Sequence, residues 1–363
     1  MRPLGILTLT HSSRATEPER CSVQFLTRRF GGRERLAEPP PFTRLAPAPT
    51  LYSGAVSFYL ASEDSAGRFH LRRLGHVRSR DRIQHAAVLP SGELLVGYEH
   101  RVVRWRPRAS LAELERIDAA DFTVTARCDH PHLAGLHTTD PLAGGPIALS
   151  CAAPDAVLLL DPAASRVERT LRMPRDLYGR GYDLAPGMDL RRHYIHDELQ
   201  TSHVNAAFGD ATGRWIAVST LIQGAIGVFD LQTGRYEEIT RGFVGCHGAR
   251  FDDKGNLYFA DSTTGHLVVL SDDGKIARRF AVASRWLHDV QQLRGPVHAF
   301  ALADANELQV WDVERDELLF RDAFPVWPVE DPDRPEDVAP PGWVGNSVQA
   351  LGWRGIGSVA QPE

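Results

Sequence analysis

The sequence has little of several features that would mark a specialised class of protein. Only four of its 363 residues are cysteines, and no two of them form a CxxC pair: Cys21, Cys128, Cys151 and Cys246. This spacing predicts reduced thiols, as in a cytoplasmic protein, rather than a disulfide or zinc scaffold. No apolar run approaches the roughly eighteen residues of a membrane span. The apolar run within residues 1–10 is also too short for a signal peptide.

The chain has no strong excess of charge of one sign. It contains 46 acidic and 41 basic residues, which gives a formal net charge of −5. This balance provides no sequence-wide attraction to nucleic acid or to an anionic membrane. We therefore expect neither as a partner and expect a small-molecule substrate instead. The P-loop, GxGxxG, GxSxG and HExxH motifs are missing from any usable context.

Long helical periodicity is nearly absent as well. The best helix candidate is the short stretch 110–117, for which Ser110 is a suitable N-cap. Elsewhere, short β-rich runs alternate with turns of Gly, Asp, Asn and Pro. That alternation is typical of a many-stranded all-β fold.

The β-rich runs repeat. Residues 245–280 contain four short runs separated by tight turns, which predicts four antiparallel strands. Four more segments follow the same plan, and their predicted second strands begin at Leu94, Ile147, Trp215 and Val297. Radial repetition of four-stranded sheets is the arrangement of a β-propeller.

Five complete blades fall between residues 81 and 324. A sixth would begin at 346–351, which matches 288–293 in pattern, and would take its missing strands from 55–60 and 68–74. The sequence therefore predicts a six-bladed β-propeller that occupies residues 1–363 as one domain and is closed by strands from both chain ends. Residues 1–50 leave a seventh blade or an outer addition open.

One blade carries a family resemblance. The segment His247-Gly-Ala-Arg-Phe…Gly255-Asn-Leu-Tyr-Phe-Ala-Asp261 resembles an NHL-type propeller repeat. The resemblance is specific over about one blade, and it implies the fold and not an activity, because propellers host many unrelated functions.

Aligning the blades places a histidine at the start of five predicted innermost strands. These are His85, His132, His203, His247 and His288, with Asn346 at the sixth position and with His130 or His137 as replacements for His132. Innermost strands surround the propeller axis, so we expect these imidazoles to form one ring. Neutral imidazole is the commonest protein ligand for metals, and nitrogen donors favour Fe, Cu, Zn or Ni over Ca or Mg. We predict a divalent transition metal there, with Fe(II) favoured and Zn or Cu as alternatives. Strand alternation should turn Cys246 and Asp289 away from it.

A long insertion at about residues 173–201 is the second candidate feature. Loops of this length in compact folds are usually functional or disordered. We interpret this one as a lid over the channel, and the alternative is a surface excursion whose aromatic residues pack on the ring. The residues expected to face a substrate are Tyr178, Tyr182, His193, Tyr194, His196 and Asn346. Those expected to orient the ring histidines are Asp129, Asp197 and Glu198.

These features favour a metalloenzyme that acts on a small organic substrate. In site geometry, the predicted ring is similar to the four-histidine iron of carotenoid-cleaving oxygenases and to the three-histidine zinc of peptide-amidating lyases. Neither family's sequence motifs are matched. The first analogy implies a non-haem Fe(II) oxygenase or oxidoreductase, and the second a zinc- or copper-dependent lyase or hydrolase. A non-catalytic propeller that binds a ligand or a protein is the alternative from another class. Residues 287–293 also resemble a short segment of aryl sulfotransferase propellers, which implies sulfuryl transfer.

Overall fold

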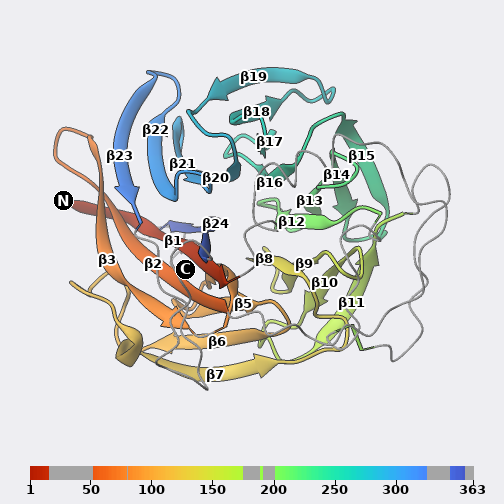
Figure 1. The fold of residues 1–363 in the computed structure, drawn as a ribbon, viewed down its shortest axis with the longest axis horizontal. Coiled ribbons are helices and arrows are strands. Elements are labelled where there is room, and N and C mark those ends of the chain that lie inside the picture. Colours follow the sequence, from red (N-terminus) through yellow and green to blue (C-terminus); the bar gives the residue numbers. More distant parts are fainter. Residues whose placement is uncertain (16–51, 80, 175–188, 191–200, 325–343, 356–363) are drawn as a thin grey trace, which may run out of the picture.

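Six four-stranded antiparallel sheets stand radially around one axis (Figure 1). The computed structural model describes residues 1–15, 52–79, 81–174, 189–190, 201–324 and 344–355. Within these ranges the protein is nearly all-β and contains no α-helix. The predicted six-bladed β-propeller is confirmed. None of the described helices is long and apolar enough to cross a membrane.

The strands of each blade are numbered outward from the axis in five of the six sheets. The innermost strands are β4 (Ile83–Val88), β8 (Leu136–Pro141), β12 (Val204–Gly209), β16 (Cys246–Phe251), β20 (Leu287–Arg294) and β24 (Val344–Gly355). The second strands are β5 (Leu94–Tyr98), β9 (Ile147–Cys151), β13 (Trp215–Thr220), β17 (Leu257–Asp261), β21 (Val297–Leu302) and β1 (Arg2–Ala15). The third strands are β6 (Val102–Pro107), β10 (Ala156–Leu160), β14 (Ala225–Asp230), β18 (His266–Leu270), β22 (Glu307–Asp312) and β2 (Tyr52–Glu63). The outermost strands are β7 (Phe122–Cys128), β11 (Val167–Arg172), β15 (Tyr236–Arg241), β19 (Ile276–Ala281), β23 (Glu317–Ala323) and β3 (Phe69–Ser79).

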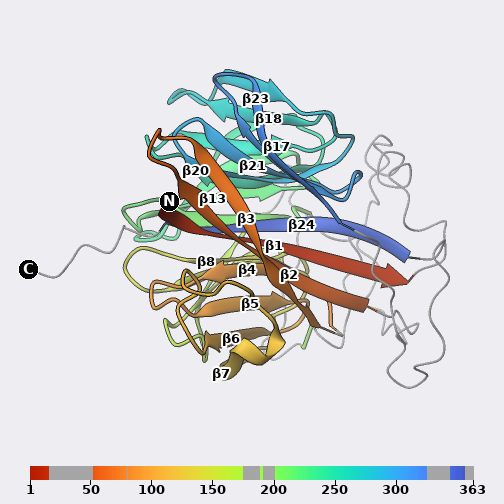
Figure 2. The same ribbon diagram turned by 90° about the vertical axis from the view of Figure 1, so that its left-hand side faces the viewer.

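The sixth blade joins the two ends of the chain. Its order is β24-β1-β2-β3, so the C-terminal strand is innermost and the N-terminal strand pairs with it (Figures 1 and 2). Closure by both chain ends is as predicted. The possible seventh blade is not formed by residues 1–15, which supply the second strand of this sheet. Opening the ring here would break the whole ladder between β1 and β24, so closure ties the two termini into one cooperative unit.

Apolar clusters fill the spaces between neighbouring blades. One joins Phe58 of β2 to Ile83 of β4, and another joins Tyr59 of β2 to Leu308 of β22. Strands β5, β9 and β10 are buried at every residue. Each lies in a sheet covered on both faces, which is why their sequences are continuously apolar instead of alternating.

The predicted helix at 110–117 was wrong. Its first residues form a turn in which Glu113 N–H donates to Ser110 O at 2.9 Å. Ile117 is 2% exposed and bridges Gly75 of β3. Among the described residues, the one helix nearby is the single 3-10 turn η2 (Ala119–Asp121). Nucleating a helix costs more than so short a stretch regains, and burial of Ile117 beside β3 favours the extended form.

Candidate functional site

Every innermost strand carries a β-bulge. At the same level of each blade, the innermost strand has one more residue than the second strand that pairs with it. The extra residue is Gln84, His137, Asn205 or His288 in four blades, and it lies within Gly248–Ala249 and Gln349–Ala350 in the other two. A bulge breaks the alternation of side chains and re-aims one of them. Here, six bulges at one level re-aim side chains around the axis.

The bulges surround a small cavity, here called the histidine cavity. It is lined by Gln84, His137, Thr138, Asn205, His247, Gly248, His288, Asp289 and Ala350. Its volume of about 10 Å³ has room for about one particle the size of a water molecule.

Four histidines from four consecutive blades gather at this level in two contacting pairs. The ring centroids of His137 and His203 are 5.0 Å apart, and those of His247 and His288 are 4.6 Å apart. Burial, together with the nearby His203, holds the pKa of His137 well below its usual range. Burial and His288 do the same for the pKa of His247. At neutral pH, His137 and His247 are therefore neutral imidazoles, the form that binds metals.

The hydrogen bonds of His247 fix its tautomer. Its Nδ1 lies 2.7 Å from Gly245 O and 2.8 Å from Ser262 Oγ. A carbonyl oxygen can only accept, so Nδ1 carries the proton. The Nε2 atom of this neutral ring therefore keeps a lone pair. Metal-binding histidines commonly hold their other nitrogen in this way.

His203 is held by the neighbouring blade. Its backbone has φ = +53°, a left-handed conformation that is unfavourable for a residue with a side chain. Asp155, in the turn between β9 and β10, accepts from the backbone N–H of His203 at 2.6 Å and from that of Thr201 at 2.8 Å. It also accepts from Ser202 N–H and from the Thr201 hydroxyl. The carboxylate of Asp155 thus compensates for the strain at His203 and fixes where the ring enters.

The structure corrects the predicted position of His85. This residue follows the bulge residue Gln84, and its side chain lines a different cavity. Its Nε2 donates to Leu351 O at 3.1 Å, and its Nδ1 accepts from the Thr139 hydroxyl at 2.9 Å. Both nitrogens are occupied by the protein, so His85 has neither left for an ion.

The structure also corrects the choice of His132. That residue lies before β8 and contacts His130, with ring centroids 5.2 Å apart. Its place in the ring is taken by His137, which the sequence offered as a replacement. The signal that favours His137 is a shared motif, since Leu136-His137-Thr138 and Leu287-His288-Asp289 have the same bulge at the histidine. Alignment on that motif would have found it.

Several predicted residues lie elsewhere. Asp129 pairs with Arg127 on the surface, with Nη2 3.1 Å from Oδ1, instead of orienting a ring histidine. Tyr178, Tyr182, His193, Tyr194, His196, Asp197 and Glu198 lie outside the described residues, and so does the side chain of Asn346, whose backbone belongs to β24.

The described part of the insertion reaches the histidine end of the axis. Leu190 is buried, and its N–H donates to Pro131 O, just before β8, at 2.8 Å. Burial and the charge of Arg172 lower the pKa of His132 in the same segment, whereas Asp189 of the insertion acts in the opposite direction. The prediction that the insertion covers the mouth of the channel stays a prediction.

The predicted metal site is not shown. Within the described ranges, no three or more His, Cys, Asp or Glu side chains are grouped as they would be around a metal ion. The four imidazoles contact in pairs and do not converge on one point. The expected ring of five histidines is thus replaced by a set of four, three of which line a narrow cavity while His203 contacts His137.

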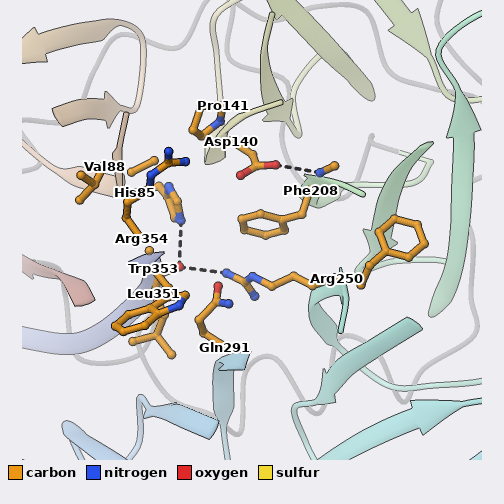
Figure 3. Close-up of a pocket in the computed structure, with 14 residues that line it drawn as sticks. His85, Val88, Asp140, Pro141, Phe208, Arg250, Gln291, Leu351, Trp353 and Arg354 are labelled. Carbon is orange, nitrogen blue, oxygen red and sulfur yellow. Dashed lines mark hydrogen bonds between the residues drawn. The ribbon is translucent and has the colours of Figure 1, made fainter. Parts of the chain in front are cut away.

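A second, larger cavity lies at the other end of the innermost strands and is here called the arginine cavity (Figure 3). Its volume is about 180 Å³. Its lining is His85, Ala87, Val88, Asp140, Pro141, Phe208, Gly209, Arg250, Phe251, Gln291, Leu351, Gly352, Trp353 and Arg354. The close-up shows the hydrogen bonds of His85 and Arg250 meeting at the carbonyl of Leu351.

A buried ion pair separates the two cavities. The side chains of Arg250 and Asp289 are only 4% exposed. The two terminal nitrogens of Arg250 donate to the two carboxylate oxygens of Asp289. Asp289 lines the histidine cavity, whereas Arg250 lines the arginine cavity. The expectation that Asp289 points away into blade packing was wrong, because the bulge at His288 breaks the alternation on which it rested. Cys246, by contrast, is fully buried in blade packing as expected.

Burial shifts two titratable groups of the arginine cavity. It lowers the pKa of His85 to about 4, and the charge of Arg250 acts in the same direction. It raises the pKa of Asp140 to about 6, although Asp140 accepts from Gly209 N–H at 2.7 Å. His85 is therefore uncharged at about pH 7, whereas Asp140 gains or loses its proton at a pH close to neutral.

Comparison with known proteins assigns the chain to no family. No family model matches the chain, and no curated protein matches it. Among solved structures, virginiamycin B lyase from Staphylococcus aureus is similar, at 11% identity and a TM-score of 0.47 over 76% of this chain and 83% of that one. A streptogramin B lyase has 12% identity and a TM-score of 0.47 over 76% of this chain and 82% of that one. Likeness at this level says nothing about activity.

Proposed function

We propose that the protein is a metal-dependent enzyme that acts on a small organic substrate, with its ion held at the histidine cavity by His137, His203, His247 and His288. The observation that carries the proposal is the gathering of these four imidazoles from four blades. His137, His247 and His288 line the histidine cavity, and His203 contacts the ring of His137. At least two of them are held neutral by burial. The paired rings would have to turn toward a common point to bind an ion.

The donor set decides which metals fit. Four nitrogen donors without a free carboxylate suit Fe(II), Zn or Cu and do not suit Ca or Mg. Bound iron would supply redox chemistry, whereas zinc or copper would polarise the substrate. We favour Fe(II) and an oxidoreductase, with a lyase or hydrolase as the runner-up. Three buried free thiols, Cys128, Cys151 and Cys246, support a reducing, cytoplasmic setting.

The chain's own residues would position the ion. Gly245 O and Ser262 Oγ hold Nδ1 of His247, so that Nε2 faces away from them with its lone pair. Asp155 holds the backbone at His203. Asn205 is fixed within the wall, since its amide donates to Cys246 O at 2.8 Å and accepts from Ser219 Oγ at 2.6 Å.

One observation favours a second candidate function. The imidazoles contact in pairs, and the described residues contain no cluster of three or more side chains arranged to bind a metal ion. A propeller that binds an organic ligand on its axis without a metal would need no such group, and the histidines would then serve as hydrogen-bonding partners.

Elemental analysis separates the two candidates. Protein purified without added metal should contain close to one equivalent of iron, zinc or copper, and a variant with both His247→Ala and His288→Ala should contain none. His298→Ala is the matched control, because His298 is also buried but lies in β21 and donates to Pro296 O at 3.1 Å. Native protein that stays metal-free after incubation with each ion in turn would refute the metal proposal and leave the metal-free candidate.

A further inference from the structure

The arginine cavity has features of a binding site that the proposed metal chemistry does not use. It lies beyond the Arg250–Asp289 pair, at the late residues of the innermost strands. Its walls combine three aromatic side chains, Phe208, Phe251 and Trp353, with a few polar ones. The accessible surface of these walls is mainly polar, and a few fixed polar groups are what orients a ligand in a small-molecule site. At about 180 Å³, this cavity is suited to a small metabolite.

One donor in the wall is left without an acceptor. The two terminal nitrogens of Arg250 donate to Asp289 and to the carbonyls of Gly248, Val290 and Leu351. The Nε atom is buried and has no hydrogen-bond partner among the residues that the structure describes. Buried N–H groups are nearly always paired. An acceptor inside the cavity would complete the bonding of this side chain.

The charges of the wall indicate the kind of acceptor. Asp289 neutralises Arg250, but Arg354 also lines the cavity and forms no ion pair with any described residue. Asp140 is the one acidic side chain in the lining. Phe208 lies beneath the guanidinium of Arg250, with Cζ 3.7 Å from the ring centroid, which leaves an apolar surface next to the donors.

We propose that the arginine cavity binds a small aromatic monocarboxylate. Its carboxylate would pair with the guanidinium of Arg354, and a small turn of the buried Arg250 side chain would let its Nε–H donate to the same carboxylate. Its ring would lie among Phe208, Phe251 and Trp353. Arginine is the usual partner of carboxylates, because its donors match their planar geometry. Asp140 opposes the ligand's charge and limits its affinity.

Benzoate is the probe, and benzamide is its neutral counterpart of the same shape. Calorimetric titration of the purified full chain should show benzoate binding and at least tenfold weaker binding of benzamide. Arg354→Gln should weaken benzoate roughly tenfold, the usual scale for losing one charged hydrogen-bonding partner. Asp140→Asn should strengthen it, because the opposing charge is gone while the acceptor for Gly209 N–H remains. Arg235→Gln, in an exposed turn, is the control for loss of one positive charge.

Three results would overturn the proposal: no benzoate binding at millimolar concentration, equal binding of benzoate and benzamide, or equal effects of Arg354→Gln and Arg235→Gln. Melting curves of each variant show that the fold is kept. The metal content of Arg354→Gln should match that of the native protein, so the failure of this proposal and that of the metal proposal are distinguishable.

Discussion

The two ends of the propeller axis are built on opposite electrostatic principles. The histidine end gathers neutral imidazoles with lowered pKa values around a space of about 10 Å³. The arginine end contains a buried ion pair and a cavity of about 180 Å³. The same strands form both ends, and the Arg250–Asp289 pair connects them, with Asp289 in the histidine cavity and Arg250 in the arginine cavity. The comparison shows that similar strands can place neutral histidines at one end of the axis and charged side chains at the other, with one buried ion pair between them.

The largest expected effect comes from breaking the buried ion pair between Arg250 and Asp289. Asp289→Ala leaves Arg250 buried and unpaired, which should lower the free energy of unfolding by about 3–5 kcal/mol. Asp129→Ala removes a surface pair with Arg127 and should cost below about 1 kcal/mol. Chemical denaturation of both variants measures the difference. Similar losses would mean that the axial pair does not hold the two ends together.

Lowering the pH should reduce the free energy of unfolding, because buried neutral histidines resist protonation in the folded state. The folded-state pKa of His85 is about 4, below its ordinary value of 6.5. The unfolded chain therefore takes up protons first as the pH falls. The contribution of His85 is complete above pH 6.5 and is lost between about pH 6.5 and 4, by up to about 3 kcal/mol. Unfolding free energies measured across that window should fall, and less steeply in His85→Gln. An equal slope in both proteins would show that His85 is not the titrating group.

A smaller effect should follow from releasing the strained backbone at His203. Asp155→Ala leaves three backbone N–H groups without their acceptor, which should lower the free energy of unfolding by about 1–3 kcal/mol. Asp161→Ala is the control: Asp161 also caps a turn of the blade that contains Asp155, by accepting from Ser165 and Arg166 N–H, but these hydrogen bonds are exposed whereas those of Asp155 are partly buried. If the proposed site is right, Asp155→Ala also weakens metal binding and Asp161→Ala does not. Equal metal affinity in the two variants would count against a positioning role.

The smallest effect should come from the second partner of His247. Ser262→Ala removes one contact to Nδ1 but leaves Gly245 O, so the tautomer is kept. Stability should change by below about 1 kcal/mol, and metal affinity by less than about tenfold. A total loss of metal would show that Ser262 does more than orient the ring.

The strands could be read from the sequence because their signals are local. Turns of Gly, Asp and Asn bound short apolar runs, and the second strands predicted to begin at Leu94, Ile147, Trp215 and Val297 begin there as β5, β9, β13 and β21. The second strand of the closing blade was missed. Pairing of β1 with β24 joins residues from opposite ends of the chain, and no local pattern records it.

Three of the four histidines, His203, His247 and His288, were predicted from the sequence, and the fourth was misplaced because of the bulges. Counting along a strand from its turn assumes that each residue pairs with one residue of the next strand. The bulge in each innermost strand adds a residue and breaks that assumption. His288 was aligned at the bulge, and His247 and His203 lie one and two residues before theirs. His85 lies one residue after Gln84 and faces the other cavity. A shift of one residue in a strand turns a side chain to the other face.

The amino-acid order alone determined the blades, because turn residues and apolar runs act over a few neighbouring positions. Which histidines meet, which one is fixed by two hydrogen bonds, and where Arg250 finds its carboxylate were decided only when six sheets closed into a ring. The bond from Arg250 to Asp289 joins residues 39 positions apart, and the bond from His85 to Leu351 joins residues 266 positions apart. Their geometry depends on bulges that the one-dimensional pattern does not mark.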